Sequence, residues 1–309
     1  MQPIPNQITF GTRLANLPHM PAEIVSNPLT ISVNPLNSLA RAAHQTPLFP
    51  RIFETAQTII PQIRAVLPIF DQNLALDPVA KTEVDNILAR VDRAAGPLGV
   101  HQFGHSDLQK WQFDTYLSNL NEILELKTLQ NGMNTGDSAN EVRVWDSTSY
   151  MNLQNTWVLK RGNVVDKFTP LVAIYVQSDA SIPSHIFDRL HSAINRRLIT
   201  MNEDGQVSLN RQGAEIEFDG PTTTTIIRAI EHMFRRLATL RVRIGILTTY
   251  ERSLVFFVNR HHIEVSQVFR RNGASPTNPL GSFMPLLTAI SLLNIIFYRH
   301  DDTWSVKLS

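Results

Sequence analysis

The chain has 309 residues, of which 43% are hydrophobic, enough to bury the core of one large domain or of a domain with an extension. Its 28 basic and 27 acidic residues give a net charge of +1, which excludes a global electrostatic attraction to nucleic acid or to an anionic membrane. The absence of cysteine excludes disulfides, thiol nucleophiles and cysteine-ligated zinc. Any nucleic-acid binding must therefore come from a local patch of charge.

The first 100 residues differ in pattern from the rest. Residues 1–50 are rich in proline and asparagine without a sustained period, which predicts an extended arm. The first residues carry neither a basic segment nor a continuous apolar run, which predicts an intracellular protein, cytoplasmic or nuclear. Two helices are expected, Arg51–Phe70 and Val79–Ala95, and glycine and proline at 96–99 end the second. Residues 51–100 are therefore predicted to be a helical extension of a domain at 101–309.

The pattern then alternates between helix and strand. A helix is expected from Ser106 to about Gln130 and another from Ser184 to Met201, where Pro183 suits the helix start. Strands are predicted at Glu141–Trp145, Asn155–Leu159 and Leu171–Gln177. The last run is continuously apolar, as in a strand buried on both faces, so we expect it at the centre of the sheet. The polar stretch 202–219 suits a hairpin.

The C-terminal part adds a helix, two strands and a closing helix. Thr222–Leu240 has apolar residues at helical spacing, and we expect this helix to pack on the sheet. Arg243–Glu251 and Leu254–Val258 are rich in β-branched and aromatic residues and predict paired strands, with Ile244–Thr248 beside the central strand. The apolar run Phe283–Tyr298 spans 16 residues, fewer than the about 20 that cross a bilayer, so a buried helix is predicted and no membrane contact. Together the elements predict an α/β fold with a mixed sheet flanked by helices.

One string in this region carries a resemblance. Gly245-Ile246-Leu247-Thr248-Thr249-Tyr250-Glu251, preceded by Ile230-Glu231-His232-Met233 and followed by Val255–Arg260 and Ile263–Ser266, resembles the second half of a PD-(D/E)XK nuclease-like domain. Such domains are common in fungal proteins, often beside a fungal-type kinase domain. The resemblance covers about residues 105–300 and implies a restriction-endonuclease-like fold. The kinase signatures do not occur in the chain, which excludes phosphoryl transfer by that route.

The resemblance also implies where the catalytic groups of an active family member would stand. Such a nuclease needs carboxylates to hold a divalent metal and a lysine to position water. The carboxylate expected on the second strand is replaced by Asn155, and the glutamate and lysine expected on the third are replaced by Tyr175 and Gln177. Only Glu122 or Glu125 on the first helix keeps an acid. We therefore expect a catalytically degenerate module without a metal or other cofactor.

A metal-dependent nuclease with a migrated active site is the alternative. It would use Glu122 or Glu125 together with Asp146 and Asp179 to hold Mg²⁺. Asp146 and Asp179 each follow a predicted strand, and aspartate at such positions is more often a turn or capping residue. His261 and His262 point to opposite faces of a strand, and His101, Gln102 and His105 surround a glycine in a loop; neither group is expected to bind metal.

A cluster of arginines is the candidate nucleic-acid contact. Glu231 is the only acid among Arg228, Arg235, Arg236, Arg241 and Arg243, so the local charge is +4. Such a cluster can bind a phosphate backbone with salt-sensitive affinity, or it can be an ordinary solvated helix face paired with acids elsewhere. The sequence thus leaves two functions open, a binding module for protein or nucleic acid and a nuclease with a relocated site.

Overall fold

The computed structural model describes residues 52–94, 116–126, 142–147, 153, 155–162, 169–177, 181–202, 206–210, 218–249, 251–259, 262–270 and 283–296. The helices are α3 (Ile59–Leu76), α4 (Pro78–Ala94), α6 (Ser118–Glu125), α8 (Ser184–Asn195), α9 (Gly220–Leu240) and α10 (Phe283–Ile296). The strands are β1 (Phe53–Thr55), β2 (Val142–Ser147), β3 (Thr156–Gly162), β4 (Thr169–Val176), β5 (Ile199–Met201), β6 (Val207–Leu209), β7 (Ile244–Thr248), β8 (Arg252–Val258), β9 (Ile263–Val265) and β10 (Phe269–Arg270). The predicted arm at 1–50 and the predicted domain boundary near residue 100 lie outside the described residues.

Eight strands form one mixed sheet of order β1-β9-β8-β7-β4-β3-β2, with β10 pairing to β8. β2, β3 and β4 form an antiparallel meander, whereas β7 runs parallel to β4. The run Leu171–Gln177 is therefore central, between the strand that contains Trp157 and Ile244–Thr248, as its apolar character predicted. The α/β class and the mixed sheet flanked by helices are confirmed.

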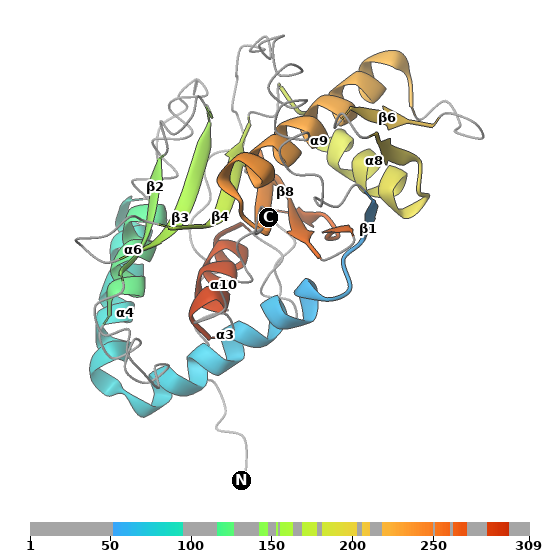
Figure 1. The fold of residues 1–309 in the computed structure, drawn as a ribbon. Coiled ribbons are helices and arrows are strands. Elements are labelled where there is room, and N and C mark those ends of the chain that lie inside the picture. The colour runs from blue at the N-terminus through green and yellow to red at the C-terminus, as the bar shows by residue number, and fades with distance from the viewer. Residues whose placement is uncertain are drawn as a thin grey trace, which may run out of the picture.

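The two faces of the sheet bury separate cores. Val172, Ile174 and Val176 of β4 pack with α3, α4, α6 and α10, whereas Ala173 and Tyr175 pack with α8 and α9. This division follows from the alternation of side chains along a strand. In Figure 1, α9 crosses one side of the sheet while α3 and α10 lie on the other. The described side chains of α10, Leu286–Leu293, are fully buried, as expected for a core helix. Within the described part of the chain, no helix is both long and apolar enough to cross a membrane.

Gly245 sets how closely α9 approaches the sheet. A Cβ atom at this position would lie 2.1 Å from Met233 Cε and 2.9 Å from a methyl group of Leu237, both on α9. Only a residue without a side chain allows this approach without displacing those groups. The glycine of the motif that carries the resemblance is thus explained by packing of a helix on β7.

The segment that follows residue 50 departs from the sequence prediction. Phe53–Thr55, expected within a helix, is strand β1 and pairs in parallel with Ile263–Val265. The helix starts only at Ile59 and continues past Phe70, with Pro68 inside it, to Leu76. Residues expected to be an extension thus supply an edge strand and part of the main core. The cause is a pairing partner about 210 residues away, which local patterns do not report.

The predicted helix at 184–201 also ends early. α8 stops at Asn195, and Arg197 adopts a left-handed backbone conformation with φ 54°. The chain then enters β5, which pairs with β6, so the expected hairpin exists but begins before the polar stretch. Of the first predicted helix, 106–130, the described part contains α6, and its remainder lies outside the described residues.

Candidate functional site

The structure brings the three positions implied by the resemblance together at one end of the central strands. The Asn155 carbonyl accepts a hydrogen bond from Val176 N–H at 3.0 Å, and Thr156 stands opposite Tyr175 in the β3–β4 ladder. Gln177 N–H donates to the Thr248 carbonyl at 2.8 Å, so the ends of β4 and β7 meet here. We call Asn155, Thr156, Tyr175 and Gln177 the polar end of the sheet. Their side chains are amides, a hydroxyl and a phenol, none of which is a carboxylate.

The Tyr175 ring is buried beneath the guanidinium group of Arg236 from α9. Its side chain is 3% exposed, and the Arg236 guanidinium carbon lies 3.5 Å from its ring centre. Arg236 Nε donates to Thr156 Oγ1 at 2.8 Å and Nη1 donates to the His232 carbonyl at 2.8 Å. Burial raises the pKa of Tyr175, and the nearby Arg236 charge opposes that rise. The phenol therefore keeps its proton at neutral pH.

His232 completes this cluster in its neutral form. Its ring stacks on Tyr175 with centroids 5.6 Å apart and an angle of 26° between planes. Burial, followed by the charges of Arg236, Arg235 and Arg228, lowers the pKa of His232 to about 4. Its buried Nε2 has no hydrogen-bond partner among the described residues. The positive charges of all three arginines therefore act on the same part of α9, around His232.

The acids of the alternative site lie on opposite faces of the sheet. Glu122 is exposed on α6 and pairs with Arg90 of α4. Asp146 on β2 pairs with Lys160 Nζ at 2.6 Å. Its neighbour Trp145 donates from Nε1 to Ser291 of α10 at 2.9 Å, so Asp146 points to the other side, toward the layer that holds α9. Each of the two carboxylates is thus paired with a basic side chain of its own layer rather than with the other acid.

Glu125 does not change this arrangement. Glu125 lines a surface hollow of about 370 Å³ between α4 and α6, away from the polar end. Asp179 lies outside the described residues, as do His101, Gln102, His105 and His261. No three histidine, aspartate or glutamate side chains of the described segments are grouped so that they could hold a metal ion.

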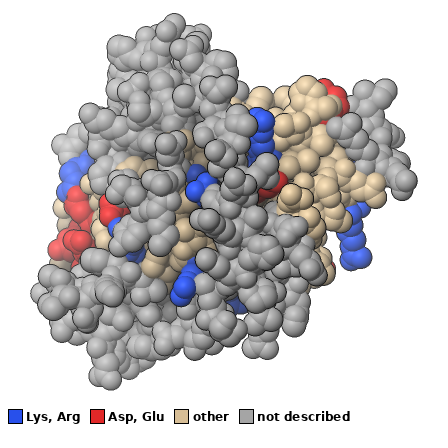
Figure 2. All heavy atoms as spheres, turned by 45° about the horizontal axis from the view of Figure 1, so that its top comes forward, with Lys and Arg blue, Asp and Glu red and all other residues tan. Residues whose placement is uncertain are grey.

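The five arginines of the predicted patch have different environments. Arg236 is 3% exposed and belongs to the cluster over Tyr175, so it is not on the surface. Arg243 Nε donates to the Val258 carbonyl at 2.9 Å and its guanidinium lies 5.3 Å from the Phe257 ring centre. Arg228 and Arg235 are half-buried and Arg241 is exposed at the end of α9. On the face drawn in Figure 2, blue side chains stand apart rather than merging into one field.

Glu231, the only acid of this helix, is turned inward. It is 6% exposed, and its carboxylate accepts a hydrogen bond from Val207 N–H of β6 at 3.4 Å. Burial raises its pKa, while the Val207 hydrogen bond and the Arg228 charge oppose the rise. Among the described residues, Arg228, Arg235 and Arg241 form no ion pair within 4.0 Å. The accessible charge of α9 is therefore basic.

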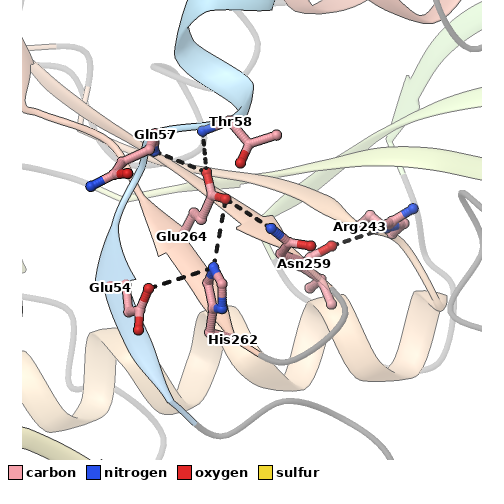
Figure 3. A network of polar contacts seen from close by, with 8 residues as sticks. Glu54, Gln57, Thr58, Arg243, Asn259, His262 and Glu264 are labelled. Atoms are coloured by element: carbon pink, nitrogen blue, oxygen red, sulfur yellow. Dashed lines mark hydrogen bonds and ion pairs between the residues drawn. The ribbon is translucent and has the colours of Figure 1, made fainter.

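A second polar network lies beside β9, near the β1 edge of the sheet, and was not found by sequence reasoning. Glu264 of β9 is 2% exposed and accepts hydrogen bonds from the N–H groups of Gln57 at 3.1 Å and Thr58 at 2.9 Å. Asn259 Nδ2 donates to the same carboxylate at 3.0 Å. Figure 3 shows these groups converging on Glu264 from the turn between β1 and α3 and from the β8–β9 turn. The signal for this network in the sequence is Glu264, an acid between the apolar residues Ile263 and Val265 of a short strand.

His262 adjoins this network. Its Nε2 lies 3.6 Å from a carboxylate oxygen of Glu54 on β1 and 3.6 Å from one of Glu264. Burial opposes ionisation of Glu264, but the hydrogen bonds from Thr58, Asn259 and Gln57 outweigh it and hold the pKa of Glu264 below its ordinary value. The network therefore contains a buried carboxylate that is charged at neutral pH.

Comparisons of the chain with protein-family models, with curated proteins and with solved structures gave no match.

Proposed function

We propose that the chain is a catalytically inactive, nuclease-like module that acts by binding, with the phosphates of nucleic acid as its ligand. The resemblance implies a helix, three strands, a helix, two strands and a closing helix. The order α6, β2, β3, β4, α9, β7, β8 and α10 supports the first half of this proposal, with α8, β5 and β6 inserted before α9 and with β9 and β10 inserted before α10. The restriction-endonuclease-like fold is part of the same proposal.

The observation that carries the proposal is the composition of the polar end. A nuclease of this type gathers oxygen ligands there for a hard divalent cation. Here Tyr175 stands at the position of the glutamate, and the guanidinium of Arg236 lies 3.5 Å from the centre of its ring. A fixed positive charge in this place repels Mg²⁺, and a protonated phenol does not replace a carboxylate. The polar end thus favours a structural role over phosphodiester hydrolysis.

The ligand class follows from the outer side of α9. Arg228, His232 and Arg235 lie on one stripe of the helix because their spacings are four and three residues. Glu231, the only acid of this helix, points away from the stripe toward Val207 of β6. Arginine contacts with phosphate are sequence-independent and weaken steeply with salt, so moderate, non-specific binding is expected. A protein partner is less favoured, because the half-buried side chains that border this stripe, Arg228 and Arg235, are cationic rather than apolar.

Two measurements on the purified protein test the proposal. Incubation with plasmid DNA and Mg²⁺ or Mn²⁺ should give no cleavage. Fluorescence anisotropy with a labelled 20-nucleotide single strand or duplex should show binding that weakens between 50 and 200 mM NaCl. The Arg228→Ala/Arg235→Ala double variant should bind about tenfold more weakly, with a smaller salt slope.

A matched control removes two exposed charges on the other side of the sheet, Arg64→Ala on α3 with Lys81→Ala on α4. It should leave binding unchanged. Cleavage that is lost on substitution of Glu122 or Asp146 by alanine would replace the proposal with the relocated nuclease. Equal losses of binding in both double variants would show that the α9 stripe is not the site.

A further inference from the structure

We propose that residues 52–58 form a strap that opens locally, while the sheet and α3 stay folded, and that the Glu264 carboxylate is its anchor. The strap comprises β1 and the turn into α3. It passes the edge of the sheet from one core to the other, since Phe53 packs in the α8–α9 core and Ile59 in the α3–α10 core. The inference does not depend on nucleic-acid binding.

The apolar attachment of the strap is small. Phe53 is its only fully buried apolar side chain, whereas the neighbouring Ile52 is 61% exposed. By contrast, α3 buries Ile59, Ile60, Ile63, Val66, Leu67, Phe70 and Leu74. Because burial of apolar area supplies most of the free energy that resists opening, the strap separates from the body at a lower cost than α3 does. The boundary between the two segments lies at Thr58 and Ile59.

The polar attachment of the strap is concentrated on β9. Ala56 N–H donates to the Val265 carbonyl at 2.8 Å, and the next two amides, Gln57 and Thr58, both donate to the Glu264 carboxylate. These two amides precede the first turn of α3, where N–H groups lack partners within the helix and favour a negative charge. One side chain therefore accepts both amides at the junction between the short parallel strand and the helix.

Opening the strap would uncover the backbone edge of β9. Ile263 and Val265, which flank Glu264, are fully buried in the closed form. A bare strand edge of this kind pairs with extended segments of other chains. The strap therefore acts as a cover for an edge that the fold otherwise leaves available.

Hydrogen–deuterium exchange of the full chain tests this inference, with the Ala56, Gln57 and Thr58 amides as reporters. In the unmodified protein these amides should exchange at least tenfold faster than those of Ile246 and Leu247 in β7, with little dependence on added denaturant. Glu264→Gln should accelerate the three reporters by a further factor of about ten. The lost contact is absent both when the strap is open and when the chain is unfolded, so β7 should accelerate by no more than this factor, and the reporters should remain faster than β7 with little dependence on denaturant. Exchange of the strap and β7 at one common rate in the unmodified protein, or reporters that Glu264→Gln does not accelerate, would overturn the proposal.

Glu54→Gln is the matched isosteric control, and it also serves if Glu264→Gln fails to fold. It removes the half-buried carboxylate near His262 without touching the amides of Gln57 and Thr58. Its effect on the reporters should be about threefold or less. A larger effect than that of Glu264→Gln would show that Glu264 is not the anchor.

Discussion

Glu264 at the edge of the sheet and Arg236 at its polar end are both buried charges, but their surroundings act on them in different ways. Glu264 accepts two backbone amides and an asparagine amide, which outweigh burial and keep its pKa low. Arg236 contacts a threonine hydroxyl, a carbonyl and an aromatic ring, and burial lowers its pKa to about 10. The first environment stabilises the charged form, whereas the second disfavours it. Of these two buried charges, only that of Glu264 is therefore expected to add to the stability of the fold.

The largest expected effect comes from removal of the Glu264 carboxylate. Glu264→Ala leaves the Gln57 and Thr58 amides without their acceptor and opens a void at the start of α3, so the free energy of unfolding should fall by about 3 kcal/mol. Urea denaturation followed by circular dichroism measures this change. A loss below about 1 kcal/mol would show that the charge of Glu264 adds no more to stability than the charge of Arg236.

Gly245→Ala tests the packing between the two regions. The added methyl group would overlap the ends of Met233 and Leu237, which are flexible enough to move but pack against β7. We expect a loss of about 2 kcal/mol in the free energy of unfolding, from overpacking. Thermal denaturation gives the value. Met233→Ala in the same chain should recover part of the loss, whereas no recovery would show that the backbone contact, not Met233, is limiting.

Arg236→Met should have a smaller effect, within about 1 kcal/mol of the unmodified protein or stabilising. A flexible apolar side chain of similar length can cover Tyr175 without the cost of burying a charge. The measurement is the same urea titration, with Arg236→Ala as the comparison that loses both charge and packing. If Arg236→Met were as destabilising as Glu264→Ala, the arginine would be a net source of stability and the contrast would be wrong.

The smallest effect is a pH dependence that belongs to Glu264. Because its folded-state pKa is held below the unfolded value of about 4.3, its contribution is fully present above that pH and is lost as pH falls through the folded-state pKa. Unfolding free energies of the unmodified protein and Glu264→Gln should therefore converge below about pH 4. Glu231 has a raised pKa and gives the opposite trend in both proteins, so only the difference between them reports on Glu264.

The sequence predicted the centre of the fold better than its edges. The continuous apolar run at Leu171–Gln177 is the pattern of a strand buried on both faces, and the amphipathic pattern at Thr222–Leu240 is that of a helix buried on one face. Both elements stand where they were expected. Phe53–Thr55 is a strand only because Ile263–Val265 lies beside it. No pattern within the segment indicates that partner.

The candidate site was predictable in part. Asn155, Tyr175 and Gln177 were assigned to two neighbouring strands, and the structure places them together at one end of the sheet, whereas their family roles stay a prediction. The burial of Arg236 was not predictable from the helix alone, because it depends on Tyr175 and Thr156 on two different strands. Charge counting treated five arginines as equivalent, whereas their exposure depends on what each meets across the sheet.

The pairing of β1 with β9 also has a consequence for synthesis of the chain on the ribosome. Thr58 and the Glu264 carboxylate that it contacts are 206 residues apart in sequence. At the usual translation rates of about 5–20 residues per second, the strap waits roughly 10–40 s before its partner strand has been made. During that interval Phe53 has no β9 to pack beside, and the amides that precede α3 remain hydrated. Completion of this edge of the sheet therefore requires an early segment to pair with a late one, and a pause in translation before residue 263 would lengthen the exposure of the early segment.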